Sequence, residues 1–326
     1  MSSYRRVGVA TGALAAVPLL VTGSSSFERT LAGLVVFALL ATALNVAFGA
    51  TDQLFLFTGA LAGVGAYTAS LSAAALGVSA WLTLPLAALV AGATAGLVSW
   101  VAARREFTAV LVAILTLNLQ LALTELFVGA SGLTGGSTGY PFEALGLAAA
   151  GDALGVSGTL VLYYLLVALL GLSLAGYVRL LDSRHGLAFA AIRADETAAR
   201  AAGIDVVRYR TAAGALAGAL VGVVGVGYIG LESYVAPSLF AFLRVDVLVL
   251  VVLVLGGLRS TLGPVVGAVV VVTLEELLRL LITGYDTVVF GALLIVVFLY
   301  FRQGIVPAAE AALARWRESG DAEEPA

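Results

Sequence analysis

Long stretches of this chain carry no charged side chain. Residues 53–103 contain neither an acid nor a base, and the other long uncharged runs are 7–27, 30–51, 107–124, 126–142, 153–178 and 211–231. A helix that crosses a bilayer needs about 20 apolar residues. Only 11% of the residues are charged, against about 25% in soluble domains, which is too few to cover a soluble globule. The sequence therefore predicts an integral membrane protein.

We expect an all-α polytopic fold with about ten transmembrane helices. A helix-breaking stretch from Gly77 to Pro85 divides the longest uncharged run into two spans. The expected spans lie roughly at 7–23, 30–49, 54–76, 81–102, 107–129, 158–180, 211–231, 245–258, 264–283 and 287–301. The eighth span is short, which suits a re-entrant or broken helix whose backbone is covered by protein.

Arginine placement predicts the orientation. All 17 basic residues are Arg. With the N-terminus in the cytoplasm, only Arg29, Arg244 and Arg279 fall toward the outside, and the others lie at or near the inner face. The positive-inside rule therefore favours a multi-pass protein of the cytoplasmic membrane with both termini inside. We expect a transmembrane domain over residues 1–307 and a cytoplasmic tail over 308–326.

The absence of Lys and Cys excludes several chemistries. Without Lys there is no P-loop of the usual type and no Schiff-base lysine. With His185 as the one His, zinc-protease motifs, iron–sulfur clusters and bis-His haem are excluded as well. We expect no enzyme activity, no metal site and no cofactor in this chain, so that any ATP is bound by a partner. The arginines are spread along the chain and form no patch that would bind nucleic acid. We therefore expect no nucleic-acid partner, and we expect membrane lipid to surround the chain.

Two loops between the expected spans are long. The outer loop, about 130–157, is rich in glycine and has no base, so it is expected to be flexible. The inner loop, 181–210, contains an Ala-rich stretch from Ala190 to Gly203, with Gly203 where a helix C-cap would lie. This pattern predicts one short cytoplasmic helix between two spans.

The inner helix has the residues of a docking element. Ala198 and Ala199 would let another protein approach closely, while Arg193, Asp195 and Glu196 could fix its register by charge pairing. A connector that merely obeys the positive-inside rule explains the same residues, and the sequence leaves both interpretations open.

Four motifs resemble those of permease subunits of branched-chain amino-acid ABC importers, in particular the M-type family. The segment 191–205, followed by Arg208, Tyr209 and Arg210, resembles the coupling loop of that family. The remaining motifs are Leu44–Gly49 leading to Gln53 and Gly63–Thr68, then Leu115–Leu117 leading to Leu133–Gly139, and finally Leu255–Ser260 with Leu262–Ala268. Together they cover residues 30–300 in the order of the family.

The resemblance implies a transport complex. An M-type chain would pair with an H-type permease chain, two separate ATPase subunits would bind ATP and the inner helices, and an extracytoplasmic solute-binding protein would deliver the substrate. In this scheme the helix at 194–203 transmits force from the ATPases. The ATPase-coupling residues are then Arg193, Asp195, Glu196, Ala198, Ala199 and Gly203.

Polar residues inside spans are candidates for the substrate pathway because burying them in a membrane is costly. The expected pathway residues are Asn45, Gln53, Phe55, Phe57, Thr58, Thr116, Asn118 and Gln120. Asn118 and Gln120 lie two positions apart, on different faces of a helix. Interhelical hydrogen bonding is the alternative role for each polar residue.

The segment 53–58 departs from the family pattern. Relatives commonly have Gln-Leu-Ser-Leu-Gly-His here, whereas this chain has Gln53-Leu-Phe55-Leu-Phe57-Thr58, with Asp52 where Gly is usual. Two aromatic rings could line an apolar cavity that suits a hydrophobic side chain, or they could face lipid.

The resulting hypothesis is a permease subunit of an ATP-driven importer for branched-chain or related amino acids. The same machinery importing urea or short amides is an alternative. An ATP-independent secondary transporter is a further one, although the sequence has no clear pair of intramembrane acids or repeated broken helix. An intramembrane enzyme is excluded because the chain lacks a nucleophile–base pair.

Overall fold

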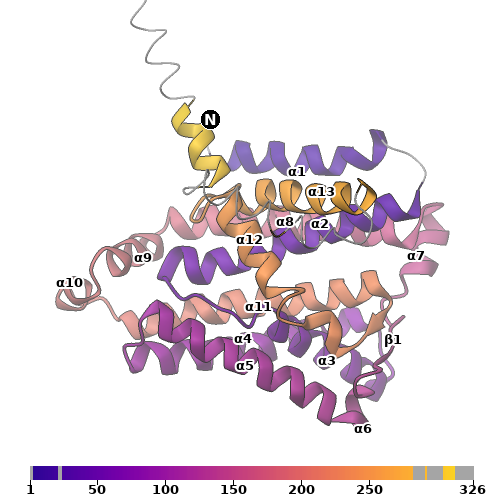
Figure 1. The fold of residues 1–326 in the computed structure, drawn as a ribbon, viewed down its shortest axis with the longest axis horizontal. Coiled ribbons are helices and arrows are strands. Elements are labelled where there is room, and N and C mark those ends of the chain that lie inside the picture. The colour runs from indigo at the N-terminus through magenta and orange to yellow at the C-terminus, as the bar shows by residue number, and fades with distance from the viewer. Residues whose placement is uncertain (1–2, 21–23, 282–290, 292–303, 313–326) are drawn as a thin grey trace, which may run out of the picture.

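The computed structural model describes residues 3–20, 24–281, 291 and 304–312. Most of its long helices lie roughly along the longest axis of the molecule (Figure 1). They are α1 (Ser3–Leu20), α2 (Ser25–Leu44), α3 (Thr58–Leu76), α4 (Leu84–Arg104), α5 (Ala109–Gly129), α8 (Gly158–Leu181), α11 (Val206–Glu232) and α13 (Gly263–Leu281). The tenth expected span, 287–301, lies outside the described residues except for Gly291.

Among the residues that the structure describes, six helical stretches are long and apolar enough to cross a membrane. They are 25–49, 58–76, 80–104, 109–129, 158–181 and 206–232. The prediction of a polytopic, all-helical membrane protein is therefore confirmed, with one pair of two-residue strands in addition. Of the other expected spans, α1 carries Arg5 and Arg6 in its first turn, and α12 (Asp246–Gly256) is the short apolar helix expected at 245–258.

Small residues bring α11 close to α4 and α3. Gly218 lies against Ala91 and Ala95 of α4, and Gly225 lies against the backbone of Ala62 in α3. Between them, Gly222 packs on α4 and also faces α3. Because these positions lack side chains, the three helix backbones approach closely, as is common in membrane bundles.

Two helices begin inside the bundle instead of at its ends. After α2, a π-helical turn η1 (Asn45–Gly49) leads into an irregular stretch, and α3 starts only at the buried Thr58. After α11, an irregular stretch containing the 3-10 turn η3 (Pro237–Phe240) leads to α12, which starts at the buried Asp246. The expectation of a span from residue 54 was therefore wrong by four residues.

One end of the bundle carries a folded cap. It contains α6 (Ser131–Thr134), β1 (Tyr140–Pro141) and α7 (Leu147–Leu154), and β1 pairs antiparallel with β2 (Tyr234–Val235) after α11. Burial raises the pKa of Tyr140, whose hydroxyl shares a 2.7 Å hydrogen bond with Ser70. The prediction of a flexible loop at 130–157 was wrong, because strand pairing and these contacts hold it on the bundle.

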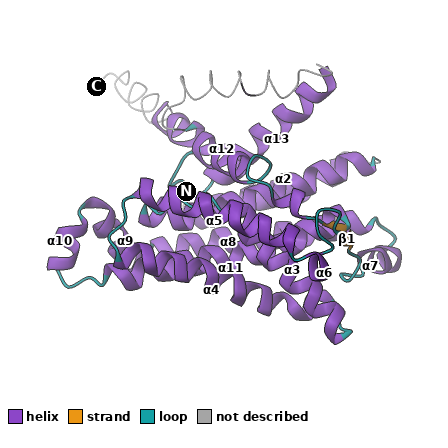
Figure 2. Cartoon of the chain, turned by 60° about the horizontal axis from the view of Figure 1, so that its bottom comes forward, coloured by secondary structure: helices purple, strands orange, loops and turns teal. Residues whose placement is uncertain are grey.

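The opposite end carries a helical arm, visible at the left of Figure 2. It consists of α9 (Arg184–Ala194) and α10 (Glu196–Ala201). The sequence predicted a single helix over 190–203. The structure has two because Asp195 is extended and its side chain accepts hydrogen bonds from the Thr197 and Ala198 N–H groups, starting a new helix.

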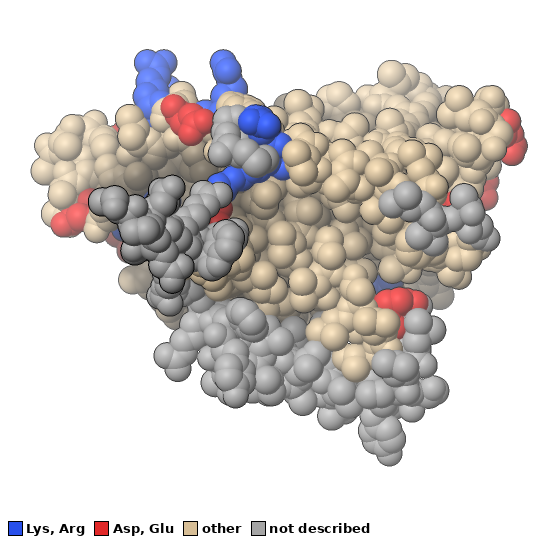
Figure 3. Space-filling view, turned by 90° about the horizontal axis from the view of Figure 1, so that it is seen from above, with Lys and Arg blue, Asp and Glu red and all other residues tan. Residues whose placement is uncertain are grey.

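Charged side chains gather near the ends of the molecule, and the face in Figure 3 is mostly uncharged between them. At the cap end, Glu232 pairs with Arg29 at 2.5 Å and with Arg244 at 3.6 Å. At the arm end lie Arg104, Arg200 and Arg210, among others. This distribution fits a protein whose middle is surrounded by hydrocarbon.

Candidate functional site

The first turn of α3 is held by a carboxyl group from another helix. Asp246 Oδ1 accepts a 2.5 Å hydrogen bond from the Thr58 N–H, and the Gly59 N–H lies 3.3 Å from each carboxyl oxygen. The first N–H groups of a helix have no partner within the helix, and their positive end favours a negative group. Asp246 therefore caps the N-terminus of α3, although it lies 188 positions after Thr58 in the sequence.

Two side chains of α5 bind neighbouring backbone groups. Gln120 Oε1 accepts from the Ala60 N–H at 2.6 Å, while its amide donates to the Phe240 carbonyl at 2.7 Å. Thr116 Oγ1 accepts from the Leu56 N–H at 3.0 Å. Gln120 is the twelfth of the 21 residues of α5. The first turn of α3 therefore lies level with the middle of α5.

The two aromatic residues of the irregular stretch point inward. Phe55 and Phe57 are almost fully buried and meet edge to face, with ring centroids 5.1 Å apart. Phe55 also reaches toward Gly214 of α11. The lipid-facing alternative for these rings is therefore wrong, and both belong to the interior packing around the start of α3.

Asn45 joins the π-helical turn to the turn between α12 and α13. Its Nδ2 donates to the Ser260 carbonyl and its Oδ1 accepts from the Arg259 N–H, both at 3.0 Å. The Arg259 guanidinium also pairs with Asp52 at 2.9 Å. Asp52 and Arg259 both have positive φ angles, 55° and 71°, so these contacts hold two backbone positions that a non-glycine residue rarely adopts.

Gln53 links the same region to α11. Its amide donates to Thr51 Oγ1 at 2.7 Å and to the Arg210 carbonyl at 2.9 Å. Its Oε1 is buried and has no hydrogen-bond partner among the described residues. The stretch 45–53 thereby contacts both α11 and the turn after α12.

Asn118 differs from the other expected pathway residues because it is exposed. Asn45, Gln53, Phe55, Phe57, Thr58, Thr116 and Gln120 are all buried. Asn118 lies on the outer face of α5, where its Nδ2 donates to the Ile114 carbonyl at 2.7 Å. As expected from their spacing, Asn118 and Gln120 occupy different faces, so the structure does not bring the eight residues into one cavity.

The arm is tied to the bundle by charged groups. Glu196 pairs with Arg200 at 2.7 Å and with Arg210 of α11 at 3.0 Å, while Arg200 also lies 3.4 Å from Glu106. The hydrogen bond to Glu196 raises the pKa of Arg200, which stays charged. Arg193 of α9 donates to the Gly49 carbonyl at the end of η1, at 3.1 Å.

The alanines of the arm face in different directions. Ala199 is buried in a small cluster with Ile192 and Val206, whereas Ala198 and Ala201 are exposed. Gly203 follows α10 with a φ of +82°, as a residue just past a helix end commonly does. Ala198 and Ala201 are therefore available to a partner, and Ala199 serves the fold of the arm.

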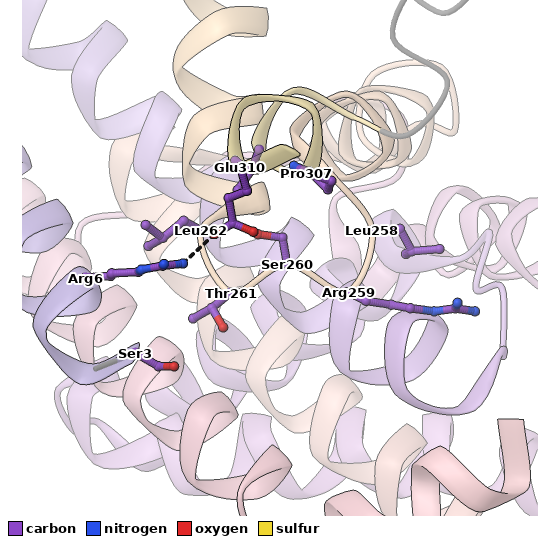
Figure 4. A pocket seen from close by; sticks show the side chains of 10 residues that line it. Ser3, Arg6, Leu258, Arg259, Ser260, Thr261, Leu262, Pro307 and Glu310 are labelled. Atoms are coloured by element: carbon purple, nitrogen blue, oxygen red, sulfur yellow. Dashed lines mark hydrogen bonds and ion pairs between the residues drawn. The ribbon is translucent and has the colours of Figure 1, made fainter. Parts of the chain in front are cut away.

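A small cavity at the arm end lies between the N-terminal and C-terminal parts of the chain. Its volume is about 340 Å³, and Figure 4 shows Arg6 and Arg259 in its lining, with Arg6 paired to Glu310. Both arginines already have acidic partners. In the described ranges, no three His, Cys, Asp or Glu side chains lie together as metal ligands would.

Sequence reasoning missed Asp246. Its signal was available, because it is the one charged residue in the expected span 245–258, and an ionisable residue inside a span marks a functional or structural site. What could not be seen was its partner, because Thr58 lies 188 positions earlier.

These features define a class of protein: a helical, multi-pass membrane protein in which two helices, α3 and α12, begin at buried residues and meet, and which has a peripheral helical arm. No solved structure matches the chain significantly.

The particular family follows from comparison with known proteins. The family model described as branched-chain amino acid transport system / permease component matches residues 26–298. The chain therefore belongs to this family, as the sequence motifs predicted. It is a permease component of a transport system and not an enzyme.

Three proteins that are similar to this chain are named as branched-chain amino acid transport permeases. The high-affinity branched-chain amino acid transport system permease protein LivM of Salmonella typhimurium is 30% identical over 292 residues, which covers 83% of this chain and 68% of LivM. LivM of Escherichia coli is 28% identical with the same coverage. The probable branched-chain amino acid transport permease protein LivH of Methanocaldococcus jannaschii is 28% identical, covering 78% of this chain and 79% of LivH.

Proposed function

We propose that this chain is the permease subunit of an ATP-driven importer that moves branched-chain or related amino acids across the cytoplasmic membrane. The substrate class rests on the relatives, whose names describe branched-chain amino acid transport. Two ATPase subunits, a second permease chain and an extracytoplasmic solute-binding protein complete the complex. The permease domain spans residues 1–307, with ten transmembrane segments and a cytoplasmic tail over 308–326.

The arm is the observation that carries this proposal. It leaves the bundle at one end, exposes Ala198 and Ala201, and is anchored through Glu196 to Arg210 at the start of α11. The chain has no Lys for an ATP-binding P-loop. We therefore assign to the arm the role of a surface that receives force from separate ATPase subunits. The arm end is then cytoplasmic, in agreement with the arginine distribution.

A continuous set of contacts supports transmission from the arm to the interior. Arg193 in the arm binds Gly49 of η1, and Asn45 of the same turn binds Ser260 beside α12. Movement of the arm would therefore shift η1 and the turn after α12 together. Because α3 and α12 meet at Asp246, this set can bias an inward–outward equilibrium.

We expect Ala198→Tyr to lower ATP-dependent uptake about tenfold in the reconstituted complex, because a bulky side chain would separate the arm from an ATPase. The melting temperature of the chain should not change, since Ala198 is exposed. Ala149→Tyr is the matched control, an exposed alanine on α7 at the other end. If Ala198→Tyr took up substrate as fast as the wild type does, the proposal that α10 contacts an ATPase would be wrong.

The outer face of α5 supports the pairing with a second permease chain. In the apolar 18-residue part of this helix, only 28% of the residues are buried, whereas in the corresponding part of the stretch 25–49 the buried share is 83%. Asn118 is exposed on this face near the middle of the helix. An amide at that depth is costly in lipid but gains hydrogen bonds against another helix. We assign α5 to the chain–chain interface, with Asn118 in contact with the second permease chain.

We expect Asn118→Leu to weaken the permease pair about tenfold, because one interhelical hydrogen bond in a membrane contributes roughly 1–2 kcal/mol. The measurement is the fraction of paired chains as the protein is diluted in detergent, followed by single-molecule photobleaching. Thr94→Val is the control, since Thr94 makes the same kind of bond to its own helix, to Val90 at 2.9 Å. Equal pairing of both variants would contradict the assignment of α5.

Uptake into proteoliposomes tests the function as a whole. The complex should accumulate radiolabelled leucine only with ATP and the binding protein present. Import of urea or acetamide without leucine would establish the alternative substrate, and uptake that persists without ATP would establish a secondary transporter.

A further inference from the structure

A groove lies on the surface of the bundle between α2, α8 and α11. Its floor is α2, which packs against both α8 and α11, and these two helices form its walls. The volume of the groove is about 550 Å³. The lining residues are Thr42, Val46, Leu172, Ser173, Gly176, Tyr177, Arg179, Leu180, Ser183, His185, Leu216 and Leu220.

The walls of the groove are apolar and open to the surroundings. Leu172 of α8 is 72% exposed and Leu216 of α11 is 52% exposed. Both helices are long and apolar enough to span a membrane, so this opening faces hydrocarbon. From Leu172 to Arg179 the groove follows α8 for about 10 Å, at 1.5 Å per residue. Such a space fits the upper part of an acyl chain.

One end of the groove is polar and positively charged. At the arm end, Arg179 is exposed at the last turn of α8, and Ser183 and His185 follow it at the start of α9. The acid in this stretch, Asp182, is not in the lining. The Ser183 hydroxyl donates to the Leu180 carbonyl at 2.7 Å, which leaves the guanidinium and the imidazole to bind the phosphate of a lipid headgroup.

Tyr177 adds a hydroxyl group to the lining of the groove. The side chain is buried, with 3% of the residue exposed, and it lines the groove. Its hydroxyl makes no hydrogen bond to the described residues and is not one of their fully buried unpaired atoms, so it can reach a ligand in the groove. A lipid ester or phosphate oxygen in the groove would accept its hydrogen.

We propose that the groove between α2, α8 and α11 binds an anionic phospholipid from the leaflet on the side of the arm, with its acyl chain between Leu172 and Leu216 and its phosphate at Arg179 and His185. The bound lipid would brace the junction of α8 with the arm. Nothing in this proposal depends on which solute is transported or on the pairing of permease chains.

Lipid binding to the purified, full-length chain in detergent tests this directly. The chain is titrated with phosphatidylglycerol or with phosphatidylcholine of the same acyl chains, and bound lipids are counted by native mass spectrometry. We expect phosphatidylglycerol to bind about fivefold more tightly, because one arginine at a membrane surface contributes about 1 kcal/mol toward an anionic lipid. Arg179→Gln should remove this preference, and Tyr177→Phe should weaken both lipids.

Matched variants separate the groove from the rest of the surface. Leu216→Trp fills the groove and should weaken both lipids, whereas Leu121→Trp, on the exposed face of α5, should change neither. Arg184→Gln removes an exposed arginine that does not line the groove and should keep the preference. Equal binding of the two lipids, or an equal effect of Arg184→Gln and Arg179→Gln, would overturn the proposal. Displacement of phosphatidylglycerol by inorganic phosphate would make this a free-anion site instead.

Discussion

Replacement of Asp246 by alanine should cost about 3 kcal/mol of stability or more and abolish uptake. Asp246 is 2% exposed, and its carboxyl group accepts hydrogen bonds from the Thr58 and Gly59 N–H groups. Each hydrogen bond to a charged group contributes roughly 1.5–3 kcal/mol, and a buried N–H group left without a partner costs a similar amount. In a membrane no water is at hand to replace the lost acceptor.

Thermal unfolding of the full-length chain in detergent measures this effect, together with leucine uptake by the complex. Asp246→Asn keeps one acceptor oxygen and should lie between the wild type and Asp246→Ala. Asp152→Ala, which removes an exposed carboxyl of α7, is the control and should behave as the wild type does. An Asp246→Ala variant as stable as this control would show that α3 does not need its cap.

Replacement of Gly222 by alanine should destabilise the bundle by about 3 kcal/mol, the upper part of the range for overpacked cores. A Cβ atom at this position would lie 2.6 Å from the Ala91 Cβ and 2.8 Å from the Ala87 carbonyl oxygen. The neighbouring atoms belong to backbone or to a methyl group, so no flexible side chain can move away. The backbones of α4 and α11 would have to separate.

Gly33→Ala provides the matched control for this variant. Gly33 also lies in a long helix, α2, but a Cβ there would meet nothing within 4 Å. We expect its melting temperature to equal or exceed that of the wild type, because alanine favours helix more than glycine does. If both substitutions lowered the melting temperature equally, close packing at Gly222 would not be what holds the helices together.

The span predictions succeeded where the pattern is local. Long uncharged runs identify helices such as α4 and α8 because each residue contributes its own transfer free energy to a continuous segment. The arm was also foreseen, since Ala-rich sequence and a terminal glycine are signals within a few residues of one another. Its division at Asp195 was missed because the same residue type can continue a helix or cap the next one.

The sequence by itself determined that this is a polytopic membrane protein of the branched-chain amino acid permease family, because hydropathy and motifs depend only on residues that are close together in the sequence. Only the tertiary structure decided where α3 begins. That start depends on buried N–H groups that are satisfied by Gln120, 60 positions from its partner, and by Asp246, 188 positions from its partner. A backbone can leave its helix inside a membrane only where such distant side chains meet it, and their meeting is a property of the folded bundle alone.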